Sequence, residues 1–209
     1  GLTFGTASIP QVYKIFGPGN QFVTVAKQLA TKYGVAIDMP AGPSELLVMA
    51  DESANAAYVA SDLLSQAEHG PDSQVILVST SKKFAEQVGN ELASQIEKLP
   101  RKEIASNAIN NSKMIVLEDF KTALKLINYY GPEHLIITTD NDDYFVKNIA
   151  NAGSVFIGKY TPESAGDYAS GTNHTLPTNG FSKAYSGVNL DSFQKSMTFQ
   201  KISQKGIKQ

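Results

Sequence analysis

Short aliphatic segments alternate with helical patterns along most of this chain, and this alternation constrains the fold more than any other feature. The aliphatic segments are residues 12–16, 35–37, 45–49, 74–78, 114–117, 135–137 and 155–157. Helical patterns occupy residues 22–33, 54–69, 82–98, 120–130 and 143–152, and glycine or proline follows each of them. We therefore predict an α/β fold with mostly parallel sheets, flanked by helices and built from Rossmann-like βαβ units.

Composition narrows the functional classes. The 209 residues are 42% hydrophobic and carry a net charge of -2, so the chain can bury a core but has no basic field for nucleic acid. No apolar run is long enough to cross a membrane. The absence of cysteine restricts any metal site to nitrogen and oxygen ligands. We expect a cytoplasmic protein with no nucleic-acid or membrane partner.

The chain begins at Gly1 without an initiator methionine and ends at Gln209 in a run that does not resemble a finished terminus. We expect a piece of a longer polypeptide; trimming or an expression remnant is the alternative. Two prolines and a glycine at residues 40–43 interrupt the alternation and suggest a break between subdomains.

The first group of candidate site residues lies where the helix over residues 54–69 ends. Gln66 and His69 are three positions apart and so share a helix face, with Asp62 on the same polar stripe. One interpretation is a histidine stabilised by the helix dipole in the last turn. The other is a metal site completed by Asp167 from a Gly-rich loop, which would suit zinc or another divalent transition metal.

The second group is Glu133-His134, which follows Gly131-Pro132 and starts a predicted strand. Histidine is the commonest general acid or base, and the glutamate could separately activate water. The alternative is a solvated pair at a strand start. Because doubly wound sheets hold ligands beyond the carboxyl ends of their strands, we expect these residues at that edge of the sheet.

A third motif is the Gly-rich turn at residues 16–20, between a strand and a helix. Such a turn can receive a phosphate or another anion at the helix N-terminus. Its spacing is not that of the dinucleotide fingerprint, and the simpler interpretation is a tight turn with Asn20 as the helix cap.

In this order, these elements resemble the histidinol dehydrogenase family. The matching stretches are residues 14–20, 36–45, 63–74, 130–135, 163–168, 171–178 and 197–200. The resemblance implies that Gln66, His69 and Asp167 bind zinc and that Glu133 and His134 transfer protons. It also implies that Asn20 contacts NAD. Contacts to the substrate are implied for Ser44, Gln66, His69, His134 and Asp167. Glu163 and His174 lie in matching stretches without an assigned role.

The resemblance further implies a fold that is incomplete relative to the full-length family. Residues 1–43 would be the remainder of a cofactor-side Rossmann-like domain, residues 44–188 a second Rossmann-like domain with the metal and catalytic residues, and residues 189–209 the start of a C-terminal extension. In the family, a further zinc-binding histidine and a substrate-binding glutamate lie beyond this point and come from the partner subunit of a homodimer.

The function implied is NAD- and zinc-dependent oxidation of L-histidinol through L-histidinaldehyde to L-histidine, the last steps of histidine biosynthesis. Two alternatives stay open: a metal-dependent hydrolase, and a structural fragment without catalysis. We expect the chain alone to be inactive.

Overall fold

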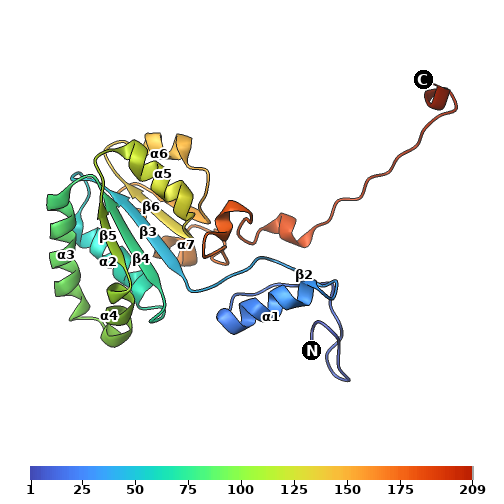
Figure 1. Ribbon diagram of the computed structural model, residues 1–209, viewed down its shortest axis with the longest axis horizontal. Helices are drawn as coiled ribbons and strands as arrows, with labels where there is room; N and C mark the ends of the chain where they lie inside the picture. Colours follow the sequence, from blue (N-terminus) through green and yellow to red (C-terminus); the bar gives the residue numbers. More distant parts are fainter. Residues whose placement is uncertain (209) are drawn as a thin grey trace.

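The computed structural model describes residues 1–208, whose strands form two parallel sheets. The larger sheet has the order β5-β4-β3-β6-β7, and all its pairs are parallel. Its strands are β3 (Glu45–Ala50), β4 (Gln74–Ser79), β5 (Lys113–Val116), β6 (His134–Thr138) and β7 (Ser154–Ile157). The strand order reverses direction between β3 and β6, as in doubly wound folds, and the predicted α/β class is confirmed (Figure 1).

Helices cover both faces of this sheet. One face packs against α2 (Ala56–Ala67), α3 (Lys82–Ile96) and α4 (Lys102–Asn110), and the other against α5 (Phe120–Tyr130) and α6 (Asp142–Asn148). Side chains alternate along the central strand: Leu46 and Val48 join the α2 side of the core, and Leu47 and Met49 join the α5 side. All four are fully buried, as expected for a strand covered on both faces.

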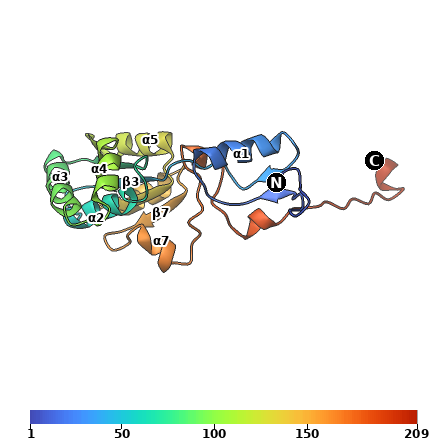
Figure 2. The same ribbon diagram turned by 90° about the horizontal axis from the view of Figure 1, so that it is seen from below.

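A smaller unit precedes this domain. It consists of β1 (Lys14–Ile15), α1 (Gln21–Thr31) and β2 (Ala36–Ile37), with the two short strands paired in parallel. Figure 2 shows this unit beside the larger domain, joined to it by the segment before β3. The proposed domain boundary after residue 43 lies between the two sheets and stays a proposal.

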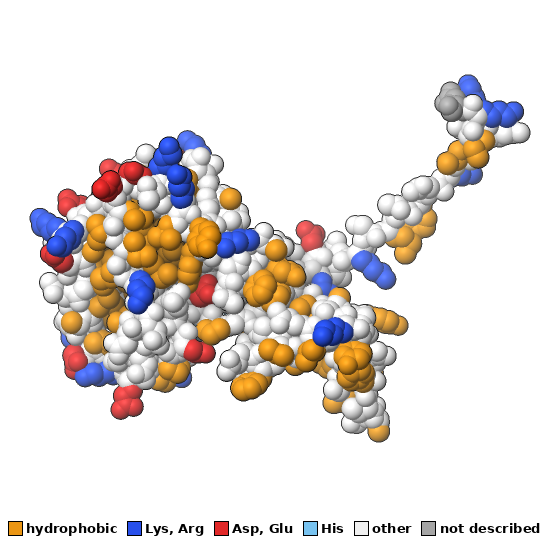
Figure 3. All heavy atoms as spheres, viewed as in Figure 1, with side chains coloured by type: hydrophobic (Ala, Val, Ile, Leu, Met, Phe, Trp, Pro, Cys, Tyr) orange, Lys and Arg blue, Asp and Glu red, His pale blue; other side chains and the backbone are white. Residues whose placement is uncertain are grey.

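Between β7 and residue 208 the chain contains only short helices: α7 (Ser164–Tyr168), η1 (Phe181–Lys183), η2 (Leu190–Phe193) and η3 (Gly206–Lys208). From η2 onward the backbone runs away from the body of the molecule (Figure 1), and hydrophobic side chains line this segment in Figure 3. Phe199 is 90% exposed there. The predicted extension over residues 189–209 stays a proposal, and Gln209 lies outside the described residues. Within residues 1–208, no helix is long and apolar enough to cross a membrane.

Three sequence expectations need correction. Helix α4 was not predicted, because its buried side is made of the small residues Ala105 and Ala108 among polar neighbours. Helix α7 contains Asp167, which was expected on a Gly-rich loop, and five residues are too few to show a helical period. Helix α2 ends at Ala67, so His69 lies just beyond the helix instead of in its last turn.

The expected edge of the sheet was also wrong. β3 begins at Glu45 and β6 begins at His134, with Leu46 opposite His134 in the register. Glu133 and His134 therefore lie at the amino ends of the strands, opposite the edge at which doubly wound sheets usually bind ligands.

Candidate active site

A cavity of about 180 Å³ opens at the amino edge of the larger sheet, facing the small unit. The residues proposed for substrate, metal and proton transfer all line it, and so do the two with no assigned role. They are Ser44, Gln66, His69, Glu133, His134, Glu163, Asp167 and His174. Pro18 and Gly19 of the small unit complete the wall. Segments far apart in the sequence thus converge on one space.

Asn20 is outside this lining. Its side chain accepts hydrogen bonds from the backbone N–H groups of Phe22 and Val23, at 3.1 and 3.2 Å, and so caps α1. The expected capping role is confirmed. A contact between Asn20 and a cofactor stays a prediction, for which the adjacent Pro18–Gly19 wall provides the route into the cavity.

The backbone of Glu45 holds both members of the predicted proton-transfer pair. Its N–H donates to Oε2 of Glu133 at 2.9 Å, and its carbonyl oxygen lies 3.2 Å from Nδ1 of His134. A carbonyl can only accept, so Nδ1 carries the proton and Nε2 of the neutral ring has a free lone pair. The first residue of β3 therefore sets the tautomer of His134 and the position of Glu133.

Close packing fixes the backbone of this pair from the β7 side. Ser154 donates its N–H to the Glu133 carbonyl at 2.9 Å. A Cβ atom on Gly153 would lie 2.5 Å from the same carbonyl oxygen, so only glycine fits at this position. Neither constraint is visible in the sequence, because both depend on the pairing of β6 with β7.

Burial sets the protonation of the site. It lowers the pKa of His134 to about 4, so the imidazole is neutral at neutral pH. Burial also raises the pKa of Glu133 to about 8, and the charge of the nearby Glu45 carboxyl adds to this. Burial raises the pKa of Glu45 itself to about 7. The site therefore holds a neutral histidine beside carboxyl groups that ionise near neutral pH.

Glu163 also lines the cavity, close to His134. Oε2 lies 3.4 Å from the Ser65 hydroxyl, which donates to it, and Oε1 lies 3.9 Å from Nε2 of His134. Burial, followed by the charge of Asp167, raises the pKa of Glu163. A substrate atom between Glu163 and His134 would meet a carboxyl group on one side and the free imidazole nitrogen on the other.

The proposed metal ligands differ in exposure. Gln66 is only 1% exposed, and neither its amide oxygen nor its amide nitrogen has a hydrogen-bond partner among the described residues. The ring of His69 uses Nδ1 for the Ser65 carbonyl at 2.9 Å, which leaves Nε2 available. Asp167 is exposed on α7.

This donor set fits a metal ion that accepts nitrogen and oxygen ligands, because an unpartnered buried amide needs a ligand of some kind. Within residues 1–208, no group of three or more His, Cys, Asp or Glu side chains is arranged to hold a metal. Only His69 and Asp167 of the proposed ligands are ionisable, so a set of three would require the amide of Gln66.

Several residues at the cavity were missed from the sequence, Thr178 and Glu45 among them. Thr178 lines it and accepts a hydrogen bond from the Gly42 N–H through its hydroxyl. Glu45 lies beneath it, where Oε1 accepts the Asn179 N–H at 2.9 Å. A buried acid at the start of an aliphatic strand was the available signal for Glu45; nothing in the sequence distinguishes Thr178.

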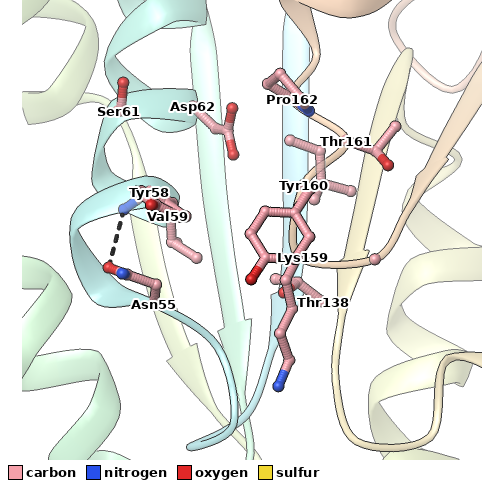
Figure 4. A pocket seen from close by; sticks show the side chains of 12 residues that line it. Asn55, Tyr58, Val59, Ser61, Asp62, Thr138, Lys159, Tyr160, Thr161 and Pro162 are labelled. Atoms are coloured by element: carbon pink, nitrogen blue, oxygen red, sulfur yellow. Dashed lines mark hydrogen bonds between the residues drawn. The ribbon is translucent and has the colours of Figure 1, made fainter.

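A second cavity, of about 280 Å³, lies on the α2 face near the carboxyl ends of β6 and β7. Figure 4 shows Tyr58 and Asp62 of α2 facing Tyr160 and Thr161 across it. Asp62 was expected on one stripe with Gln66 and His69, but it lines this cavity instead of theirs. None of the residues proposed for the site lines this second cavity, although it lies at the expected edge of the sheet.

Comparison with known proteins decides the family. The histidinol dehydrogenase family model matches residues 1–209. The chain belongs to the histidinol dehydrogenase family. It is 60% identical over 207 residues to histidinol dehydrogenase of Bacteroides thetaiotaomicron, with 99% of this chain and 48% of the relative covered. The Campylobacter jejuni enzyme is 57% identical over 208 residues, with 99% and 49% covered.

Solved structures agree. The crystal structure of histidinol dehydrogenase from Elizabethkingia anophelis matches with a TM-score of 0.95 and 57% identity, covering 99% of this chain and 48% of that one. Gamma-glutamyl phosphate reductase from Thermotoga maritima shares the fold alone, with a TM-score of 0.52, 13% identity, and 82% and 50% covered. The chain spans about half the length of the curated relatives that it matches.

Proposed function

We propose that the full-length protein carrying this sequence oxidises L-histidinol through L-histidinaldehyde to L-histidine, with NAD as oxidant and zinc at the site. Membership of the histidinol dehydrogenase family supports the reaction. The observation that carries the assignment of roles is the backbone of Glu45, whose N–H and carbonyl hold a weakly acidic glutamate and a neutral histidine side by side. Such a pair suits two proton transfers of different kinds.

His134 acts on the alcohol. Its free Nε2 accepts the hydroxyl proton as the C–H bond of the alcohol carbon breaks and the aldehyde forms. Because burial lowers the pKa of His134 to about 4, the basic form is present throughout the neutral range. The Nδ1 hydrogen bond to Glu45 keeps the ring oriented during the transfer.

Glu133 acts on the aldehyde. As a carboxylate it removes a proton from a water molecule while the oxygen bonds to the aldehyde carbon, which gives the hydrate. The hydrate is an alcohol again, so His134 takes its proton in the second oxidation after it has released the first proton to solvent. Glu133 is a base only when ionised, and with a pKa of about 8 its carboxylate fraction rises through neutral pH.

Gln66, His69 and Asp167 would hold zinc through the amide oxygen, Nε2 and a carboxylate oxygen. Zinc bound there would help to orient the substrate, and NAD would accept a hydride in each oxidation. Asn20 and the Pro18–Gly19 wall would face NAD. Ser44 lies on the same cavity wall as Glu133 and would contact the substrate, as would the metal-binding residues and His134.

We also propose a cytoplasmic homodimer. Hydrophobic side chains exposed along the C-terminal segment support it: Phe193, Met197, Phe199 and Ile202 are each at least 64% exposed. A surface of this kind usually contacts another protein surface. The exposed positions of His69, Asp167 and His174 at the cavity mouth are consistent with a second subunit that completes the site.

The test uses the full-length protein with L-histidinol and NAD, with NADH followed by absorbance. Because the proposed reaction contains two oxidations of two electrons each, we expect two NADH per L-histidinol consumed. We also expect activity to be lost when a chelator removes zinc. Metal-dependent cleavage without NADH would favour the hydrolase alternative. Zinc binding without NADH or cleavage would overturn the proposed function.

A further inference from the structure

A buried ion pair in the small unit holds both polar groups of one backbone residue, Gly17. Lys27 of α1 donates from Nζ to the Gly17 carbonyl at 2.7 Å and forms an ion pair with Oδ1 of Asp38. Oδ2 of Asp38 accepts the Gly17 N–H at 2.8 Å. The N–H and the C=O of Gly17 are thus bound by opposite members of one ion pair.

The pair is fully enclosed. The side chain of Lys27 is 5% exposed and that of Asp38 is 0% exposed. Oδ1 of Asp38 also accepts the Met39 N–H at 2.6 Å, so each carboxylate oxygen has at least one donor. Enclosed ion pairs of this kind add little net stability, because the loss of hydration offsets their attraction. They do, however, restrict the geometry of whatever they bind.

Gly17, the residue bound by Lys27 and Asp38, directly precedes two residues that line the cavity. Gly17 leads into Pro18 and Gly19, which line the same space as His134, Glu133 and Gln66. Strands β1 and β2 have two residues each, so the sheet of the small unit offers few hydrogen bonds to hold this loop. Gly17 itself has a φ of +149°, which side chains rarely adopt, so the loop has an unusual backbone to maintain.

We propose that Lys27 and Asp38 are positioning residues that clamp the loop of residues 17–20 in the geometry that receives the ligand bound between the small unit and the larger domain. The ligand class is the nicotinamide cofactor, which rests on the function proposed above. The clamp itself is independent of that function, since every contact in it lies within residues 17–39.

The experiment compares two double variants of the full-length protein. Lys27→Met with Asp38→Leu removes both buried charges together, so no uncompensated charge remains and folding is expected to be kept. Lys102→Met with Glu97→Leu makes the same exchange at an exposed pair that is 2.6 Å apart and serves as the control. The single variant Asp38→Asn keeps the side-chain volume and disturbs the bond to the Gly17 N–H.

Hydrogen–deuterium exchange of the segment with Gly17 reports the clamp without any ligand. We expect this segment to exchange roughly tenfold faster in the buried double variant, the factor for loss of about one net hydrogen bond, with no change in the control. Unchanged exchange in both the double variant and Asp38→Asn would overturn the clamp. If the double variant does not fold, Lys27→Arg is used, because it keeps both charges and changes only the donor to the Gly17 carbonyl; unchanged exchange in Lys27→Arg would overturn the clamp.

Equilibrium binding of NAD then tests positioning. The clamp predicts a dissociation constant raised roughly tenfold or more in the buried variants, with kcat at saturating NAD changed less than about twofold. Faster exchange with unchanged NAD affinity would show a merely structural pair. If the unaltered protein does not bind NAD, the proposed function is wrong. The hydrogen–deuterium exchange result would still show whether Lys27 and Asp38 hold the loop.

Discussion

Replacing Gln66 with methionine is expected to stabilise the 209-residue chain while it weakens zinc binding. Gln66 lies in the last turn of α2, is 1% exposed, and leaves both amide atoms without a hydrogen-bond partner among the described residues. A buried polar group without a partner costs about 1–3 kcal/mol, and an apolar group of similar shape removes that cost. Methionine has nearly the same length and a similar helix propensity.

The magnitude follows from these values. In the absence of metal, Gln66→Met should raise the free energy of unfolding by about 1–2 kcal/mol, measured by urea denaturation in a chelating buffer. Gln87→Met on the exposed side of α3 is the matched control and should change stability by less than about 0.5 kcal/mol. The zinc comparison uses the full-length protein: there, zinc-containing buffer should reduce the advantage of Gln66→Met, because zinc stabilises only a protein that binds it.

A decrease in stability for Gln66→Met in chelating buffer would refute this reasoning. It would mean that the amide of Gln66 is already satisfied within the folded chain, so no orphaned group would remain to indicate a ligand. In the full-length protein, an advantage that is the same with and without zinc would show that Gln66 does not contribute to metal binding.

Three further predictions concern packing, protonation and the metal. Gly153→Ala should destabilise the chain by about 1–3 kcal/mol in urea denaturation, because the new Cβ would clash with the Glu133 carbonyl oxygen. Gly89→Ala, inside α3, is the control and should stabilise the chain by about 0.5–1 kcal/mol. Equal effects of the two substitutions would contradict the packing argument. The raised pKa of Glu45, about 7 against its ordinary 4.5, means that the folded state binds more protons in this range, so stability should fall as pH rises from about 4.5 to about 7. Glu45→Gln should flatten that fall in denaturation series at several pH values, and an unchanged slope would refute it. Calorimetric titration should show weak zinc binding or none by the isolated chain; tight binding abolished by His69→Ala would show that three ligands suffice.

The fold could be predicted well because its signals are local. Each strand of the larger sheet was expected within one or two residues, and α5 (Phe120–Tyr130) was expected with its observed limits. The left-handed Gly131 at its end, with a φ of +66°, explains why the stop signal was reliable. Helix α4 escaped because alanines at positions 105 and 108 give little hydrophobic contrast.

The site was predicted less evenly. The side chains lining the cavity were identified from rare residue types and from the resemblance to a family, and the structure brings them together. Their edge of the sheet was wrong, since a general rule about doubly wound sheets was applied to residues that begin a strand. The contributions of Glu45 and Gly153 depend on strand register, which one sequence does not contain.

The most direct test of the central claim is to count NADH per L-histidinol in the first turnover of the full-length protein and its variants. Glu133→Gln should form one NADH at a nearly normal rate and then stall, because hydration of the aldehyde loses about 100-fold or more without its base. His134→Ala should slow both oxidations, and Glu118→Gln on the surface should change neither. Two NADH formed at the normal rate by Glu133→Gln would contradict the division of labour between Glu133 and His134.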